Sequence, residues 1–176
     1  VQDQRALERP RRWAVLVGVN RYEDEQGVGS LKYCVADMKL LKEVLIGRNG
    51  GFDPKNVLLM TADADNPLHR PTYSNLVTMI PRWLADIGPD DGGRVGLAGH
   101  GMGEGGQCYR LPGDAKRGNL RLTRLGLPLV REWLDSCRAK RKVLILDACH
   151  SGAGRALGKM EDEWKRELES GHGFMR

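Results

Sequence analysis

Four apolar runs of strand length, separated by segments with helical periodicity, constrain the fold of this chain more than any other feature. The runs lie at residues 13–19, 56–61, 94–99 and 143–146. Continuous apolar strands of this kind are typical of parallel sheets that are buried on both faces. Their alternation with helical segments predicts an α/β fold with a mostly parallel sheet and helices on both faces. The first run should lie centrally in the sheet.

Three helices are expected between these runs, because apolar residues recur there at helical spacing. The first covers residues 31–45, the second runs from the candidate N-cap Thr72 to Ile87, and the third starts near Thr123. Pro81 should kink or divide the second helix. Residues 107–112 look like a short strand or a loop. The glycine-rich residues 99–106 therefore lack the following helix that a phosphate-binding loop needs, and their glycines should let the backbone crowd the site.

Length, charge and cysteine pattern restrict the class of protein. The 176 residues suit one domain with a full core. The net charge of +5 has its excess mostly in residues 1–12, a leader that we expect to be solvated, with no nucleic acid or membrane partner. No apolar run approaches the roughly 20 residues that span a bilayer, and no secretory signal is evident. The four cysteines show no CxxC or zinc spacing, so we expect no metal site and a reducing, cytoplasmic location.

Two potentially reactive residues follow two of the predicted strands. His100 comes directly after residues 94–99, and Cys149 comes shortly after residues 143–146. The carboxyl ends of parallel strands meet at one edge of a sheet, so these side chains can meet in space. A cysteine attacks a carbonyl as the thiolate, and a nearby histidine can take its proton and later protonate the leaving amine. Alone, Cys149 could be a small buried hydrophobe, but the pair favours a catalytic dyad.

The segments Gly99-His100-Gly101 and Asp147-Ala-Cys149-His-Ser-Gly152 resemble the caspase-like cysteine peptidases, of the metacaspase and bacterial orthocaspase type. The resemblance covers residues 13–154, the predicted large-subunit catalytic domain. It implies a caspase-like sheet completed by a small-subunit chain, and an endopeptidase with His100 and Cys149 as its catalytic residues. The backbone N–H groups of Gly101 and Cys149 would form the oxyanion hole.

The same resemblance implies a preference for arginine or lysine before the cut bond. In metacaspases the pocket for this residue is lined by positions that match Asp147, Cys34 and Asp37 here. A carboxylate can bind a guanidinium through charge-assisted, often bidentate, hydrogen bonds. Without the resemblance, Asp37 would be interpreted as an exposed helix carboxylate. Ala98 departs from the family pattern, because metacaspases usually carry a small polar residue there.

The resemblance leaves activation and assembly open. The dyad requires no cofactor, and activation by Ca²⁺ would have to use loop oxygens such as those of Asp90, Asp91 or Asp114, since no EF-hand pattern occurs. Residues 155–176 form a charged segment with helix-spaced apolar residues, expected to be an inter-subunit linker. Arg176 could be a processing site of a zymogen or the end of a gene fragment. The rival functions are a catalytically silent caspase-like assembly or signalling module and a flavodoxin-like binding domain.

Overall fold

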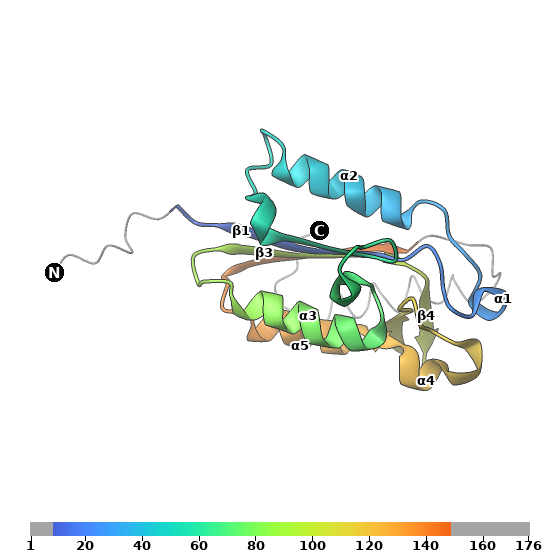
Figure 1. Ribbon diagram of the computed structural model, residues 1–176. Helices are drawn as coiled ribbons and strands as arrows, with labels where there is room; N and C mark the ends of the chain where they lie inside the picture. The colour runs from blue at the N-terminus through green and yellow to red at the C-terminus, as the bar shows by residue number, and fades with distance from the viewer. Residues whose placement is uncertain (1–8, 149–176) are drawn as a thin grey trace.

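The computed structural model describes residues 9–148, and its centre is a parallel four-stranded sheet (Figure 1). The strand order is β2-β1-β3-β7, with all three pairings parallel. The strands are β1 (Arg12–Gly18), β2 (Val57–Thr61), β3 (Gly92–Gly99) and β7 (Arg141–Ala148). The predicted α/β fold and the internal position of the first strand are confirmed.

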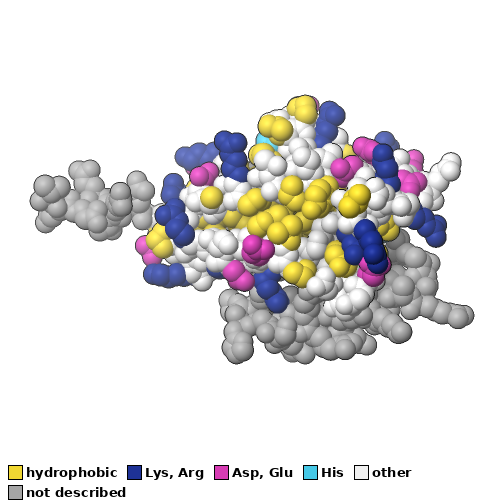
Figure 2. All heavy atoms as spheres, turned by 90° about the horizontal axis from the view of Figure 1, so that it is seen from below, with side chains coloured by type: hydrophobic (Ala, Val, Ile, Leu, Met, Phe, Trp, Pro, Cys, Tyr) yellow, Lys and Arg dark blue, Asp and Glu magenta, His cyan; other side chains and the backbone are white. Residues whose placement is uncertain are grey.

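Helices cover both faces of this sheet (Figure 1). Helix α2 (Cys34–Ile46) lies on one face, and α3 (Tyr73–Ala85) and α5 (Leu127–Ser136) lie on the other. The larger core cluster lies under α3 and α5, whereas α2 fully buries only Cys34 and Met38. Figure 2 shows the α3 and α5 face, where hydrophobic side chains form a band between charged groups. Each fully buried aliphatic side chain contributes roughly 1.5–3 kcal/mol, so the α3 and α5 layer supplies most of the packing energy.

Helix α3 follows the predicted pattern but continues through its proline. Its buried side chains Leu76, Ile80 and Leu84 are spaced four residues apart and face the core. The Thr72 side chain accepts a hydrogen bond from the Asn75 N–H, which confirms the predicted N-cap. Of the kink or division predicted at Pro81, the division is wrong, because α3 is one helix from residue 73 to residue 85. Proline removes one backbone hydrogen bond, and we attribute the continuity to packing of the three buried residues around it.

A second, smaller sheet follows His100 and contains the short strand that was one of the two alternatives predicted for residues 107–112. Its antiparallel strands are β4 (Gly101–Glu104), β5 (Gln107–Arg110) and β6 (Leu125–Gly126). Gly105 and Gly106, with φ of 62° and 77°, form the two-residue turn between β4 and β5. Two consecutive positive φ angles are what a tight type I′ hairpin needs. These two glycines therefore serve a turn, not a phosphate site.

The third predicted helix starts later than expected. Residues 120–123 form the short helix α4 (Leu120–Thr123), and Leu125 is fully buried in β6 before α5 starts at Leu127. Pro128 lies in the first turn of α5, a position that proline favours. The remaining short helices are α1 (Glu25–Val28) and the 3-10 turns Pro54–Asn56, Pro67–His69 and Arg117–Asn119. No helix within residues 9–148 is long and apolar enough to cross a bilayer.

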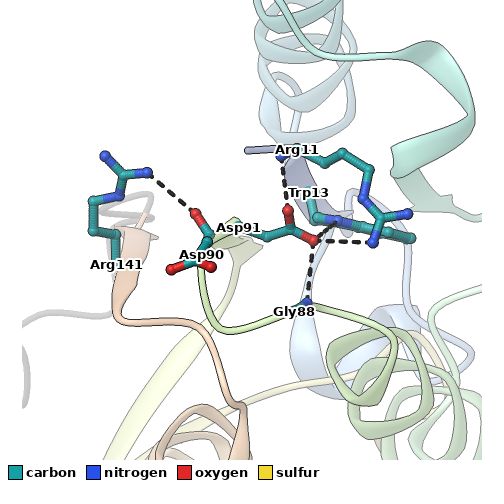
Figure 3. Close-up of polar contacts among 6 residues, drawn as sticks. All are labelled: Arg11, Trp13, Gly88, Asp90, Asp91 and Arg141. Atoms are coloured by element: carbon teal, nitrogen blue, oxygen red, sulfur yellow. Dashed lines mark hydrogen bonds and ion pairs between the residues drawn. The ribbon is translucent and has the colours of Figure 1, made fainter. Parts of the chain in front are cut away.

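Asp91 ties the start of β1 to the loop before β3 (Figure 3). Its buried carboxylate accepts hydrogen bonds from the N–H groups of Arg11 and Gly88 and from the Trp13 indole, and it pairs with the Arg11 guanidinium at 3.3 Å. Burial raises the pKa of Asp91, but the hydrogen bonds from Arg11, Gly88 and Trp13 and the Arg11 charge together bring it below its ordinary value. The ionised carboxylate therefore stabilises the folded state.

We expect Asp91→Asn to lower the free energy of unfolding by about 1–3 kcal/mol at neutral pH, the usual effect of disturbing a buried hydrogen-bonded acceptor. Because the folded-state pKa is depressed, this contribution is present above the unfolded-state pKa and is lost as the pH falls through the folded-state pKa. Urea unfolding at neutral and acidic pH measures it. Asp90→Asn is the matched control, since the Asp90 side chain is 78% exposed with one 3.4 Å contact to Lys140. Equal effects of both variants would contradict this role.

Candidate active site

The register of β3 and β7 aligns the two strand ends that precede the predicted dyad. Ala98 pairs with Asp147, and Gly99 pairs with Ala148. His100 follows Gly99 directly, and Cys149 follows Ala148 directly. Adjacent strands lie about 4.8 Å apart. His100 and Cys149 therefore each follow a residue, Gly99 or Ala148, whose partner lies on the neighbouring strand at the carboxyl edge of the sheet. Cys149 itself lies outside the described residues, and its catalytic role stays a prediction.

The backbone of His100 is held from two sides. Its N–H donates to the Tyr22 hydroxyl at 2.8 Å, and its carbonyl accepts from the Leu111 N–H at 3.0 Å. The Tyr22 and His100 rings also lie 5.2 Å apart at 32°. Tyr22 is buried in the segment between β1 and α1, so the fold fixes the histidine through a residue far from it in sequence.

Burial sets the protonation state of His100. Burial lowers the pKa of its imidazole, and a hydrogen bond with the Gly29 backbone partly opposes this shift. The net pKa stays below the ordinary histidine value. The neutral imidazole is therefore favoured at physiological pH, and this is the form that can accept a proton from a thiol.

Gly99 has a structural reason to be glycine. Its φ is 156°, and a Cβ at this position would lie 3.2 Å from the Tyr22 hydroxyl and 3.4 Å from Val19 Cβ. The missing side chain thus allows Tyr22 to approach the backbone of His100. Gly101, the predicted oxyanion donor, begins β4 and pairs with Arg110.

The three predicted substrate-binding residues lie near the carboxyl ends of the strands on the α2 side. Cys34 is buried with Ala98 in the core under α2, and the half-buried Asp147 is the register partner of Ala98. Asp37 lies in the first turn of α2 and is exposed. A Cβ on Gly18 would come within 2.8 Å of the Cys34 carbonyl, so this glycine lets the start of α2 pack closely against β1. The roles of these residues in specificity stay predictions.

Residues that the sequence analysis missed complete this edge of the sheet. They are Tyr22 and Gly29, which contact His100, and Arg110, which is buried and bonds to the carbonyls of Gly99 and Asp147. Neither Tyr22 nor Gly29 belongs to a recognisable motif. The one available signal was Arg110, a charged residue between Cys108 and Leu111 in an otherwise poorly charged stretch.

The aspartates considered as calcium ligands are engaged elsewhere. Asp91 holds Arg11, Trp13 and Gly88, and Asp114 accepts from the Tyr73 N–H at 2.8 Å. The part of the chain described by the structure contains no cluster of three or more His, Cys, Asp or Glu side chains suited to a metal ion. Calcium activation stays a prediction without an identified site.

Within residues 9–148, cavities occur at both ends of the strands. A cavity of about 540 Å³ is lined by residues at the amino ends, among them Arg12, Arg94 and Arg141, far along the strands from His100. A cavity of about 20 Å³ lies beside His100 and Arg110, large enough for about one water molecule. The larger cavity is therefore not the predicted catalytic site, and the smaller one cannot hold a substrate side chain.

Comparison of the sequence with known proteins identifies the family of this chain. The profile of the caspase domain (Peptidase_C14) matches residues 11–172, which is most of the chain. The chain belongs to the caspase-domain family. This assignment agrees with the parallel sheet and with the edge formed by β3 and β7.

Individual relatives support the same assignment. Metacaspase-1 of Ajellomyces capsulatus is 29% identical over 158 residues, covering 84% of this chain and 42% of the relative. Metacaspase-1A of Aspergillus niger is 28% identical over 158 residues, covering 84% and 37%. A crystal structure of a Geobacter sulfurreducens protein matches with a TM-score of 0.58 and 20% identity, over 89% of this chain and 56% of that one, which supports the fold. The chain thus spans about two fifths of the length of these metacaspases.

Proposed function

We propose that this chain carries the catalytic residues of a cysteine endopeptidase that cleaves after arginine or lysine, with His100 as base and Cys149 as nucleophile. The observation that carries the proposal is the β3–β7 register, which pairs Gly99 with Ala148, the residues directly before the two members of the dyad. The depressed pKa of His100 adds support, because the base is neutral before it accepts the thiol proton.

The proposed reaction uses groups from both strand ends. His100 takes the thiol proton of Cys149, and the thiolate adds to the substrate carbonyl carbon. His100 then gives the proton to the leaving amine, and a water molecule hydrolyses the acyl-enzyme to restore the thiol.

Gly101 is suited to stabilise the oxyanion of this reaction. Hydrogen-bonded and non-hydrogen-bonded pairs alternate along an antiparallel ladder. The Leu111 N–H donates to His100, so the next pair, Gly101 with Arg110, falls at a non-hydrogen-bonded position. The Gly101 N–H is thereby directed away from β5. We propose it as an oxyanion donor together with the Cys149 N–H.

The proposed specificity rests on the carboxylates of Asp147 and Asp37. Asp147 is half-buried beside Ala98, where a guanidinium bound to it would be partly desolvated. Charge-assisted hydrogen bonds gain strength in such surroundings. Asp37 is exposed at the start of α2 and would contribute from the rim.

We also propose that a small-subunit chain completes the sheet beside β7. In the described residues β7 pairs with β3 alone, and its residue Val143 is 37% exposed. An uncovered parallel strand edge favours association. Intact mass spectrometry and gel filtration of the full-length protein test this idea, since two fragments that elute together would support it. Active protein with no contact partner for β7, shown by hydrogen exchange along the strand, would contradict it.

A panel of fluorogenic peptides that differ only in the residue before the cut tests the function. We expect the full-length protein to cleave arginine and lysine peptides and to leave aspartate and leucine peptides intact. A preference for aspartate would point to the specificity of caspases proper. Cleavage of none of them, with a folded protein, would favour the silent assembly module.

A further inference from the structure

A buried arginine connects the histidine strand to the cysteine strand. Arg110 ends β5 in the small sheet and has 5% of its surface exposed. Its Nη1 group donates to the Gly99 carbonyl at 3.0 Å and to the Asp147 carbonyl at 3.1 Å. These carbonyls belong to the residue directly before His100 and to the residue two before Cys149. One guanidinium nitrogen thus holds both strand ends.

The backbone of the same segment holds the histidine as well. Arg110 pairs with Gly101, and the next residue, Leu111, donates its N–H to the His100 carbonyl. Segment 110–111 therefore contacts Gly99, His100 and Gly101 in succession. The Arg110 side chain extends this contact to β7, which in residues 9–148 belongs to the other sheet.

Arg110 is surrounded by apolar side chains, so the cost of burying its charge has to be offset by what its hydrogen bonds do. The cavity of about 20 Å³ beside it is also lined by Val17, Leu76, Leu97 and Leu125. A guanidinium among apolar side chains is costly to bury, and a hydrophobic residue of similar volume is often more stabilising. In the same low-dielectric surroundings its hydrogen bonds to carbonyl groups are stronger. Among the described residues, the guanidinium holds two backbone carbonyls in position, which a hydrophobic residue of similar volume could not do.

We propose that Arg110 is a positioning residue that fixes the separation of the two strand ends, and with it the approach of His100 to Cys149. This inference rests on the proposed function for its effect on cleavage. Misplacement of reacting groups by about 1 Å can lower a rate about 10²-fold. The substrate contact proposed for Asp37, which lies on α2 and outside these hydrogen bonds, would be affected less.

The test compares Arg110→Met, Arg110→Lys and Arg124→Met in the full-length protein. Arg124 is the matched control, because it also lies next to the small sheet, with a side chain 12% exposed that pairs with Glu104 and stacks 3.7 Å from the Tyr109 ring. Both of these partners, Glu104 in β4 and Tyr109 in β5, belong to the small sheet and not to β3 or β7. The readouts are kcat and KM on an arginine peptide, melting temperature, and the pH dependence of Cys149 alkylation.

We expect Arg110→Met to lower kcat about 10²-fold with KM changed less than about threefold, and to move the midpoint of Cys149 alkylation toward the value of about 8.5 of an isolated thiol. Arg110→Lys should recover part of kcat, and Arg124→Met should keep the wild-type kcat and alkylation profile. Arg110→Met values equal to those of Arg124→Met would overturn the proposal. If Arg110→Met does not fold, Arg110→Lys decides, and a wild-type kcat and profile in that variant would overturn it.

The alkylation profile separates this inference from the proposed function. If the wild type cleaves no basic peptide, the proposed function fails. A shift of the Cys149 profile in Arg110→Met but not in Arg124→Met would then still support the positioning role, and unchanged profiles would refute it.

Discussion

Cys149→Ala is expected to abolish peptide cleavage, and His100→Ala to lower kcat by about 10²–10⁴, the usual contribution of a general acid and base. The two residues act on one proton, so their losses should not add. The double variant should be no less active than Cys149→Ala alone. Steady-state kinetics of the full-length protein on an arginine peptide measure these effects.

Two controls make this result specific to the dyad. Circular dichroism should show an unchanged fold, since His100 and Cys149 come directly after the last residues of β3 and β7 in the sequence. His69→Ala, in an exposed turn outside the site, should leave kcat unchanged.

Because the pKa of His100 is depressed, the wild type should stay active below the ordinary histidine pKa and lose activity as the imidazole becomes protonated. Retained activity in Cys149→Ala would refute the nucleophile.

Asp147→Asn should weaken cleavage after arginine far more than cleavage after a neutral residue. Loss of one partner of a desolvated charge pair costs about 2–5 kcal/mol, which at 1.4 kcal/mol per tenfold is roughly 30-fold to several thousand-fold in kcat/KM. The asparagine keeps the size of the side chain, so the backbone carbonyl held by Arg110 should stay in place. The measurement is kcat/KM on matched arginine and norleucine peptides.

Asp37→Asn should have a smaller effect in the same direction, because Asp37 is exposed and solvent screens its charge. Asp86→Asn is the control for a change in net charge, at the end of α3 on the opposite face of the sheet. An arginine preference unchanged in Asp147→Asn would show that another group selects the substrate.

The sheet could be predicted because its strands are continuous apolar runs. Residues 13–19 and 57–61 carry side chains that are buried on both faces, and neither run has a charged residue that would suggest a surface. The start of α3 could also be predicted, because the Thr72 side chain caps the N–H of Asn75, which is only three residues away in sequence. The late start of α5 was not predictable from periodicity, because Leu125 belongs to the apolar pattern but pairs with Arg110 in the small sheet.

The candidate site was predictable only as far as its motifs. His100, directly after β3, and Asp147, near the end of β7, lie in local motifs, and the parallel register brings these two strand ends together. Tyr22 and Arg110 act across 78 and 37 residues of sequence, on His100 and Asp147 respectively. Their contacts depend on how the small sheet and the β1–α1 segment pack. The local sequence around Tyr22 or Arg110 contains no pattern from which these contacts could be predicted.

Peptide mapping after reaction of the full-length protein with a peptidyl-arginine chloromethyl ketone tests the central claim most directly. This one experiment tests whether Cys149 is the nucleophile, whether His100 activates it and whether the pocket selects a basic residue. A matched peptidyl-aspartate chloromethyl ketone serves as the control reagent. We expect a single adduct on Cys149 in the wild type, strongly slowed labelling in His100→Ala, and little labelling by the aspartyl reagent. An adduct on Cys34, Cys108 or Cys137 instead, or equal labelling of Cys149 by the aspartyl reagent, would contradict it.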